Sequence, residues 1–146
     1  MTIRTMTIND YEKVYSLWLS TPNMGLNNLD DSKEGIAKYL SRNPNTCFVA
    51  EKDGEIIGVI LSGHDGRRGY IHHAAVNESE QRNGIGTALL NAALSALKDE
   101  GINKVALVVF GKNEKGNTFW EKQGFITRDD LNYRNKAITE LTRIDT

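Results

Sequence analysis

The stretch Ser79–Leu90, SEQRNGIGTALL, joins a strand-like run to a helical pattern, and it constrains the fold more than any other part of the chain. Gly84 and Gly86 stand one residue apart, directly before apolar residues spaced as on one face of a helix. Glycine permits a tight turn and leaves room beside the backbone. The first turn of a helix presents amide groups that no helical carbonyl accepts, so this junction is suited to hold a phosphate.

Three classes of phosphate-binding site are built on such a junction, and two of them fit this chain poorly. A nucleoside-triphosphate loop requires G-x-x-x-x-G-K-[ST], and no lysine followed by a hydroxyl residue stands at that spacing. A dinucleotide fingerprint requires a third glycine, where the chain has Leu89. It also requires an acidic residue after the next strand, and the run KVALVVF ends without one.

The other patterns predict one domain of mixed α/β class over residues 1–146. We expect strands at 2–6, 46–52, 55–64, 69–76, 104–110 (buried) and 136–143 (closing), and helices near 9–18, 31–40, 84–99 and 113–122. The Asp53–Gly54 pair predicts a tight hairpin turn. The order implies an antiparallel meander that leads into a strand–helix–strand crossover.

Helix starts are predicted from capping spacings. Asn9 with Glu12, and Asp31 with Glu34, have the spacing of a capping box at the first two helices. Residues 20–31 between these helices are rich in turn formers and predict a loop.

Composition excludes several classes of function. With 18 basic and 19 acidic residues, the chain has no basic field to hold nucleic acid. Its one cysteine, Cys47, lies in an apolar run, so we expect a small buried side chain, no internal disulfide and no metal site. The N-terminus lacks a signal-peptide core and no apolar run reaches membrane-spanning length, so we expect a cytoplasmic protein without membrane contact.

The third class of phosphate-binding site fits the glycine loop, and the match is to a known protein family. Gln81–Gly86 matches Q/R-x-x-G-x-G/A and resembles the acyl-CoA pyrophosphate loop of the GNAT superfamily of N-acyltransferases. Ala74–Val76 stands at the strand end where that family binds pantetheine, and Asn113 with Phe119–Phe125 is similar to its second signature, N-x-x-A-x-x-L-Y-E-K-x-G-F. These matches span residues 70–126, and the terminal segments match only in the pattern of elements.

The resemblance implies a central, mostly antiparallel sheet, a β-α-β crossover that carries the acyl-CoA site, and about four helices. It implies acetyl-CoA as co-substrate, no metal, and direct attack of a primary amine on the thioester in a ternary complex. The implied cofactor contacts are Ala74, Ala75, Val76, Gln81, Arg82, Asn83, Gly84, Ile85, Gly86, Thr87, Asn113, Asn117 and Trp120.

For catalysis, the resemblance points to the backbone N–H of Val76 as the oxyanion donor and to His72 as the base. Strand alternation places Tyr70, His72 and Ala74 on one face and His73 on the other. An imidazole titrates near neutrality and suits base work, but His72 can equally be a hydrogen-bonded packing residue.

The chain departs from the family at Trp120, where many members carry a tyrosine that protonates the leaving sulfur. An indole N–H donates a hydrogen bond but no proton, so either the thiolate leaves unassisted or another group is the acid, for which Tyr133 is the candidate. This departure keeps open an alternative function, a non-catalytic module that binds or senses acyl-CoA.

The sequence predicts only that the acceptor is an amine. A small amine, an amino acid, an antibiotic and a protein N-terminus are all compatible with it. The loop Met24–Asp31 carries Asp30 and Asp31, which would attract a cationic amine, although a helix cap is the simpler role for Asp31. An exposed strand edge is compatible with a homodimer.

Overall fold

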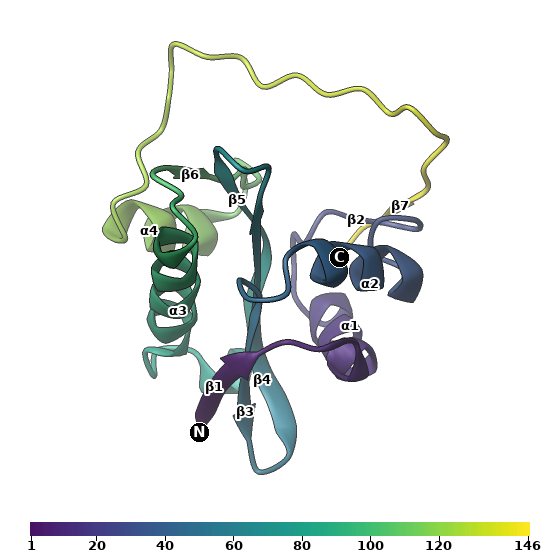
Figure 1. Cartoon of the computed structure of the whole chain (residues 1–146), viewed down its shortest axis with the longest axis vertical. Coiled ribbons are helices and arrows are strands. Elements are labelled where there is room, and N and C mark those ends of the chain that lie inside the picture. Colours follow the sequence, from purple (N-terminus) through teal and green to yellow (C-terminus); the bar gives the residue numbers. More distant parts are fainter.

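A computed structural model describes all 146 residues of the chain (Figure 1). Its strands are β1 (Thr2–Thr5), β2 (Leu26–Asn27), β3 (Phe48–Lys52), β4 (Glu55–His64), β5 (Gly69–Val76), β6 (Val105–Ala106) and β7 (Arg143–Ile144). Its α-helices are α1 (Tyr11–Leu19), α2 (Lys33–Arg42), α3 (Ile85–Asp99) and α4 (Glu114–Lys122), with 3-10 turns η1 (Ile8–Asp10) and η2 (Glu78–Glu80). None of the helices has the length and apolar character needed to span a bilayer.

The central sheet has the order β1-β3-β4-β5-β6, and only the β5–β6 pair is parallel. Helices α1 and α2 cover one face, and α3 and α4 cover the other (Figure 1). The mostly antiparallel sheet with a β5–α3–β6 crossover confirms the predicted fold class.

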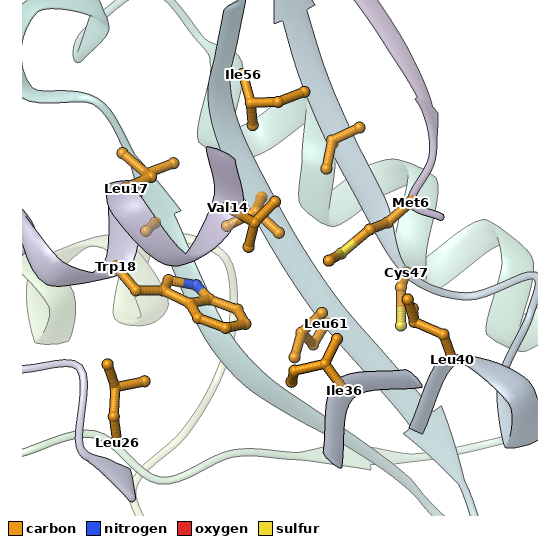
Figure 2. Packing of buried hydrophobic residues seen from close by; sticks show 13 residues of the cluster. Met6, Val14, Leu17, Trp18, Leu26, Ile36, Leu40, Cys47, Ile56 and Leu61 are labelled. Carbon is orange, nitrogen blue, oxygen red and sulfur yellow. The ribbon is translucent and has the colours of Figure 1, made fainter. Parts of the chain in front are cut away.

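Two separate apolar clusters hold the helices to the two faces. The first lies under α1 and α2, where the fully buried Trp18 packs with Val14 and Leu61 over β4 (Figure 2). The second lies under α3 and α4, and Leu89, Leu90 and the other buried residues of α3 form its centre. Burial of a leucine-sized side chain contributes roughly 1.5–3 kcal/mol, so each cluster anchors its own helix layer.

The β3–β4 hairpin turns at Asp53–Gly54, as predicted. Both residues have positive φ, 53° and 78°, which is the geometry of a two-residue turn that matches the strand twist. The register of β3 against β4 shifts between Ala50 and Glu51, so a bulge lies near the turn.

The predicted capping boxes are wrong at both helices. Ser32, not Asp31, is the N-cap of α2, because its hydroxyl accepts from the amide of Gly35 at 3.0 Å. At the first helix, the amide of Thr7 donates to Asp10 Oδ2 at 2.9 Å, so the chain turns two residues before Asn9. The carboxylate of Asp31 is occupied elsewhere, by a residue of β5.

The C-terminal third departs most from the sequence-based expectation. The predicted strand 104–110 pairs with β5 only at Val105 and Ala106. The predicted strand 136–143 is wrong: residues 125–142 contain no helix or strand, and Ile138 is 99% exposed. Instead β7 pairs with β2 in a separate two-stranded sheet, and the segment before it loops away from the body (Figure 1). Alternation alone cannot form a strand where no sheet edge lies alongside.

Cys47 should be chemically inert in the folded protein. Its side chain is fully buried, its Sγ donates to the carbonyl of Ser62 at 3.2 Å, and burial raises the pKa of the thiol to about 12. We expect an aromatic disulfide reagent to react with the native protein at least ~100-fold more slowly than with the unfolded chain. The same sample in concentrated guanidinium chloride is the control, and equal rates in both would contradict the burial of this thiol.

Candidate active site

The site begins where β5 and β6 separate. The two strands pair at Gly69 with Val105 and at Tyr70 with Ala106, and no later residue of β5 is paired with β6. The amide of Asn77 donates to the carbonyl of Ile57 at 2.8 Å, so the backbone of Asn77 faces β4. Backbone groups alternate between the two edges of a strand. The N–H of Val76 therefore points to the opposite edge, into the space that β6 has left.

The side chain of Gln81 is bonded to the same open edge of β5. Gln81 Nε2 donates to the carbonyl of Val76 at 3.2 Å, which ties the following loop to the end of β5. Ala75 is placed differently from our expectation: it pairs with Val59 of β4, and its side chain lies in the first apolar cluster. It is turned away from the opening, whereas Ala74 and Val76 pack on the α3 side.

The two glycines of the loop serve different purposes. Gly84 is the N-cap of α3, has a left-handed φ of 76°, and nothing lies within 4 Å of where its Cβ would stand. A Cβ on Gly86 would lie 3.2 Å from the ring of Phe119, so this glycine allows α4 to pack on α3. The Cβ side of Gly84 is thus open to a ligand, whereas the Cβ side of Gly86 faces the ring of Phe119 and its amide stays at the start of α3.

The start of α3 presents unpaired amides to the opening. The first bond of the helix runs from the amide of Ala88 to the carbonyl of Gly84 at 3.0 Å, so the amides of Ile85, Gly86 and Thr87 precede it. Gln81, Arg82 and Asn83 are exposed, and Arg82 also has positive φ. Positive charge and helix dipole together favour an anion at this place.

The hydroxyl of Thr87 and the side chain of Ile85 are used inside the protein. Thr87 Oγ1 accepts from Gln123 Nε2 at 3.1 Å, and the Ile85 side chain is buried in the second cluster. These two residues can therefore meet a ligand through their backbone amides.

The asparagines near α4 hold the chain that bounds the opening. Asn113 is the N-cap of α4 and accepts from the amide of Gly116 at 2.9 Å. Asn117 Nδ2 donates to the carbonyls of Phe110 and Asn113, at 3.0 and 2.9 Å. Trp120 is half-buried, with its ring 4.9 Å from that of Phe119 and 5.1 Å from that of Phe125. Each of these residues has a clear packing or capping role.

A bulge in β5 overturns the predicted faces of the histidines. The register with β4 shifts between Val59 and Leu61, and His73 opposite has a left-handed φ of 44°. An extra residue puts two successive side chains on one face. His73 therefore lies against Trp18 at a ring distance of 5.2 Å, on the same α1–α2 face as His72.

His72 lies among aromatic rings. The ring centroids of Tyr70 and Tyr39 are 4.5 and 5.7 Å from that of His72, and solvent still reaches the side chain. The surrounding protein, and next the charge of His73, lower the pKa of His72 to about 4. The ring is neutral at neutral pH, where it accepts a hydrogen bond but is a weak base.

Sequence reasoning missed the pair formed by His73 and Asp31. His73 Nε2 lies 2.7 Å from Asp31 Oδ1, and Asp31 Oδ2 accepts from the amide of Asn27 at 2.8 Å. The two residues stand 42 positions apart, so no local pattern reveals the contact. The only hint in the sequence was that Asp31 lies in the loop Met24–Asp31, whose acidic residues we expected to attract a cationic amine.

Tyr133 is not packed into the site. It is 66% exposed and lies in the irregular segment 125–142. Burial and then the charge of Tyr133 raise the pKa of Tyr70, so the two phenols lie within electrostatic range. No group of three or more His, Cys, Asp or Glu side chains is arranged to hold a metal ion.

The neutral state of His72 among its aromatic neighbours should make stability depend on pH. The unfolded ring binds a proton below its ordinary pKa near ~6.5, whereas the folded ring binds it only near 4. The stabilising contribution is therefore present above about pH 6.5 and is lost as pH falls toward 4. We expect the Tm to fall less steeply over this range in His72→Gln than in the parent. Parallel curves would show that this ring does not contribute.

Comparison with known proteins agrees with this geometry. A family model described as acetyltransferase (GNAT) family matches residues 11–125. Acetyltransferase SG1711 of Sodalis glossinidius is 30% identical over 140 residues, with 96% of this chain and 97% of that protein covered. Acetyltransferase ECA0875 of Pectobacterium atrosepticum is 29% identical, with 96% and 98% covered.

Solved structures share the fold. Ard1 from Thermoplasma volcanium has a TM-score of 0.75 and 26% identity, with 84% of this chain and 80% of that chain covered. The PaiA N-acetyltransferase from Thermoplasma acidophilum, in complex with coenzyme A, has a TM-score of 0.73 and 21% identity, with 84% and 87% covered. With its open β5 edge and its glycine turn at the start of α3, the chain belongs to the GNAT acetyltransferase family.

Proposed function

We propose that this acetyltransferase moves the acetyl group of acetyl-CoA to a primary amine, by direct attack of the neutral amine within a ternary complex. The observation that carries the proposal is the edge of β5 that β6 leaves uncovered, which ends in the turn at Gly84. An extended ligand arm can lie along that edge while its diphosphate meets the start of α3.

The diphosphate is held by the amides of Ile85, Gly86 and Thr87, with Arg82 beside them. The absence of side-chain atoms around Gly84 leaves the space that the diphosphate needs. The pantetheine arm then runs between β5 at Ala74 and Val76 and the chain that leads to α4. Asn113 and Trp120 bound this path on the α4 side, and the carboxamide Nδ2 of Asn113 has no bond within the protein.

The Val76 amide supports the chemical step. It points into the opening and has no partner in β4, so it can donate to the carbonyl oxygen of the thioester as negative charge develops there. The new C–N bond forms as the C–S bond breaks, and coenzyme A leaves as a thiolate. A thiol titrates near ~8.5, so this thiolate is a tolerable leaving group without an acid at Trp120.

The acceptor is proposed to approach from the α1–α2 face. His72 and His73 lie on that face, and the loop that precedes α2 borders it. Asp30 of this loop is exposed and accepts from Asn27 Nδ2 at 2.9 Å, so it presents a negative charge to solvent. This charge attracts a cationic amine.

The glycine turn provides the sharpest test of cofactor binding. In Gly84→Glu, a negatively charged side chain stands where the diphosphate would lie, so we expect affinity for coenzyme A to fall at least ~100-fold in calorimetry. Gly101→Glu is the matched control, because Gly101 follows the other end of α3 with nearly the same left-handed φ, 80° against 76°, and equally open space.

The control separates ligand loss from backbone strain. Both substitutions strain a left-handed residue, so both should lower the Tm by a similar amount. Gly101→Glu should bind coenzyme A within about threefold of the parent. If Gly84→Glu binds as tightly as Gly101→Glu, the assignment of the loop is wrong.

Trp120 allows a test of sulfur protonation. Trp120→Tyr introduces a phenol with a pKa near ~10, and we expect turnover to rise by up to ~10-fold, with the gain fading above that pH. The smaller ring leaves a gap beside Phe119 and Phe125, so stability should fall by about 1–3 kcal/mol.

Trp120→Phe is the control for this gap, because it removes similar volume without adding a hydroxyl. Turnover should be measured across pH for both variants with acetyl-CoA and a panel of amines. A folded Trp120→Tyr enzyme that is no faster than Trp120→Phe at any pH would show that departure of the thiolate needs no acid here.

A further inference from the structure

From the contacts of Asp31, we infer that the proton released by the attacking amine goes to His73, held by Asp31, and not to His72. This inference rests on the proposed acetyl transfer and assigns the proton acceptor of that reaction. His73 acts as the base, and Asp31 is a positioning residue that acts through it.

The hydrogen bonds of Asp31 define which nitrogen of His73 is available. The Asp31 side chain is 5% exposed, and each of its oxygens has one donor, the amide of Asn27 at Oδ2 and His73 Nε2 at Oδ1. A carboxylate only accepts, so Nε2 carries the hydrogen and the lone pair of neutral His73 lies on Nδ1. Nδ1 has no bond within the protein and is not among its sealed, unpaired atoms, so solvent or a ligand can reach it.

Helix α1 holds both members of the pair in place. The indole Nε1 of the fully buried Trp18 donates to the carbonyl of His73 at 3.1 Å, which fixes the left-handed backbone of the bulge. The hydroxyl of Tyr11 donates to the carbonyl of Asp31 at 2.7 Å. A base whose position is set by buried contacts can act without a reorganisation cost at the moment of reaction.

The pair also lies close to the reacting centre along the strand. His73 stands three residues before Val76, a distance of roughly 10 Å along a strand, and imidazole and substrate together can span it directly or through one water. The titratable groups that face His73 are Asp31 from the loop before α2 and His72 from β5, and Tyr11 of α1 contacts the backbone of Asp31. Asp31 is the one hydrogen-bonded to the ring.

His72 lacks this support. Its neighbours are the rings of Tyr39, Tyr70 and His73, and no carboxylate is hydrogen-bonded to it. An imidazolium formed at His72 would have no hydrogen-bonded counter-charge, because Asp31 and Asp30 act on it only through space. One formed at His73 keeps the carboxylate of Asp31 at 2.7 Å.

The proton balance of the step is simple. The amine nitrogen forms its bond to the acetyl carbon and gives one proton to Nδ1 of His73, while the C–S bond breaks and its electron pair leaves with the thiolate. The hydrogen between Nε2 and Asp31 stays on Nε2. The imidazolium then returns its proton to solvent through Nδ1.

The kinetic test compares His73→Gln, Asp31→Asn and His72→Gln, with His64→Gln as the control outside the site. The probes are acetyl-CoA with 2-phenylethylamine, spermidine and a peptide with a free N-terminal alanine. We expect His73→Gln to lower kcat at least ~100-fold while the affinity for coenzyme A stays within about threefold. Asp31→Asn should lower kcat ~10-fold and move the acid limb of the pH profile to lower pH, because a lost counter-charge disfavours the imidazolium. A greater loss in His72→Gln than in His73→Gln overturns the inference.

A second measurement needs no acceptor. The ¹⁵N shifts of the imidazoles, with the His73 signals identified by their absence in His73→Gln, should show the Nε2–H tautomer in the parent protein, and Asp31→Asn should change this ring's titration. An Nδ1–H tautomer, or a titration unaffected by Asp31→Asn, refutes the inference whatever the activity. If the Gly84 test fails while the tautomer is as expected, the proposed function is wrong and the Asp31–His73 bond stands.

Discussion

The hydrogen bond from the Trp18 indole to the His73 carbonyl fixes the bulge on which the geometry of the site depends. Before the bulge, the amide of Gly69 donates to the carbonyl of Lys104, on the β6 side of the sheet. The backbone groups of odd-numbered β5 residues therefore point toward β6, and those of even-numbered residues point toward β4. After the bulge, the amide of Asn77 donates to Ile57 of β4, so the backbone groups of odd-numbered residues now point toward β4. Without the extra residue, the amide of Val76 would be bonded within the sheet. One buried contact from α1 thus makes a strand amide available to a ligand and places two histidines on one face.

The parts of the fold that sequence predicts well are those set by local chemistry. The Asp53–Gly54 turn needs two residues of positive φ, and those residues supply them at low cost. The glycine turn before α3 is visible because Gly84 and Gly86 stand between two clear patterns. The features that escape prediction depend on partners distant in sequence. Strand alternation assumes a regular strand, so it assigns the wrong face to His73 beyond a bulge. Capping spacing is a local pattern, so it does not reveal that Asp31 is bonded to His73 and not to α2.

The turn and the helix start proposed to hold the cofactor could be predicted from the sequence, whereas the arrangement of the side chains on the α1–α2 face could not. Loop and helix-start residues act through backbone amides, whose direction follows from the secondary structure. The asparagines show the limit of this reasoning, because Asn113 and Asn117 have capping and bracing bonds that a signature does not distinguish from ligand contacts. On the acceptor side, the roles depend on which side chains α1 and the loop before α2 bring to β5. The last strand illustrates the same point, since β7 pairs with β2, a short strand in a stretch read as a loop.

The division of the core by the sheet has a consequence for divergence. The residues that would hold coenzyme A stand on the face anchored by the second cluster, and the histidines with Asp31 stand on the face anchored by the first. If the acceptor enters on the α1–α2 face as proposed, substitutions that remodel α1, α2 and the loop between them would alter acceptor choice while the α3–α4 layer keeps its shape. Under that proposal, sequence change in one helix layer could yield new acceptor specificities while the layer that holds the donor is inherited unchanged.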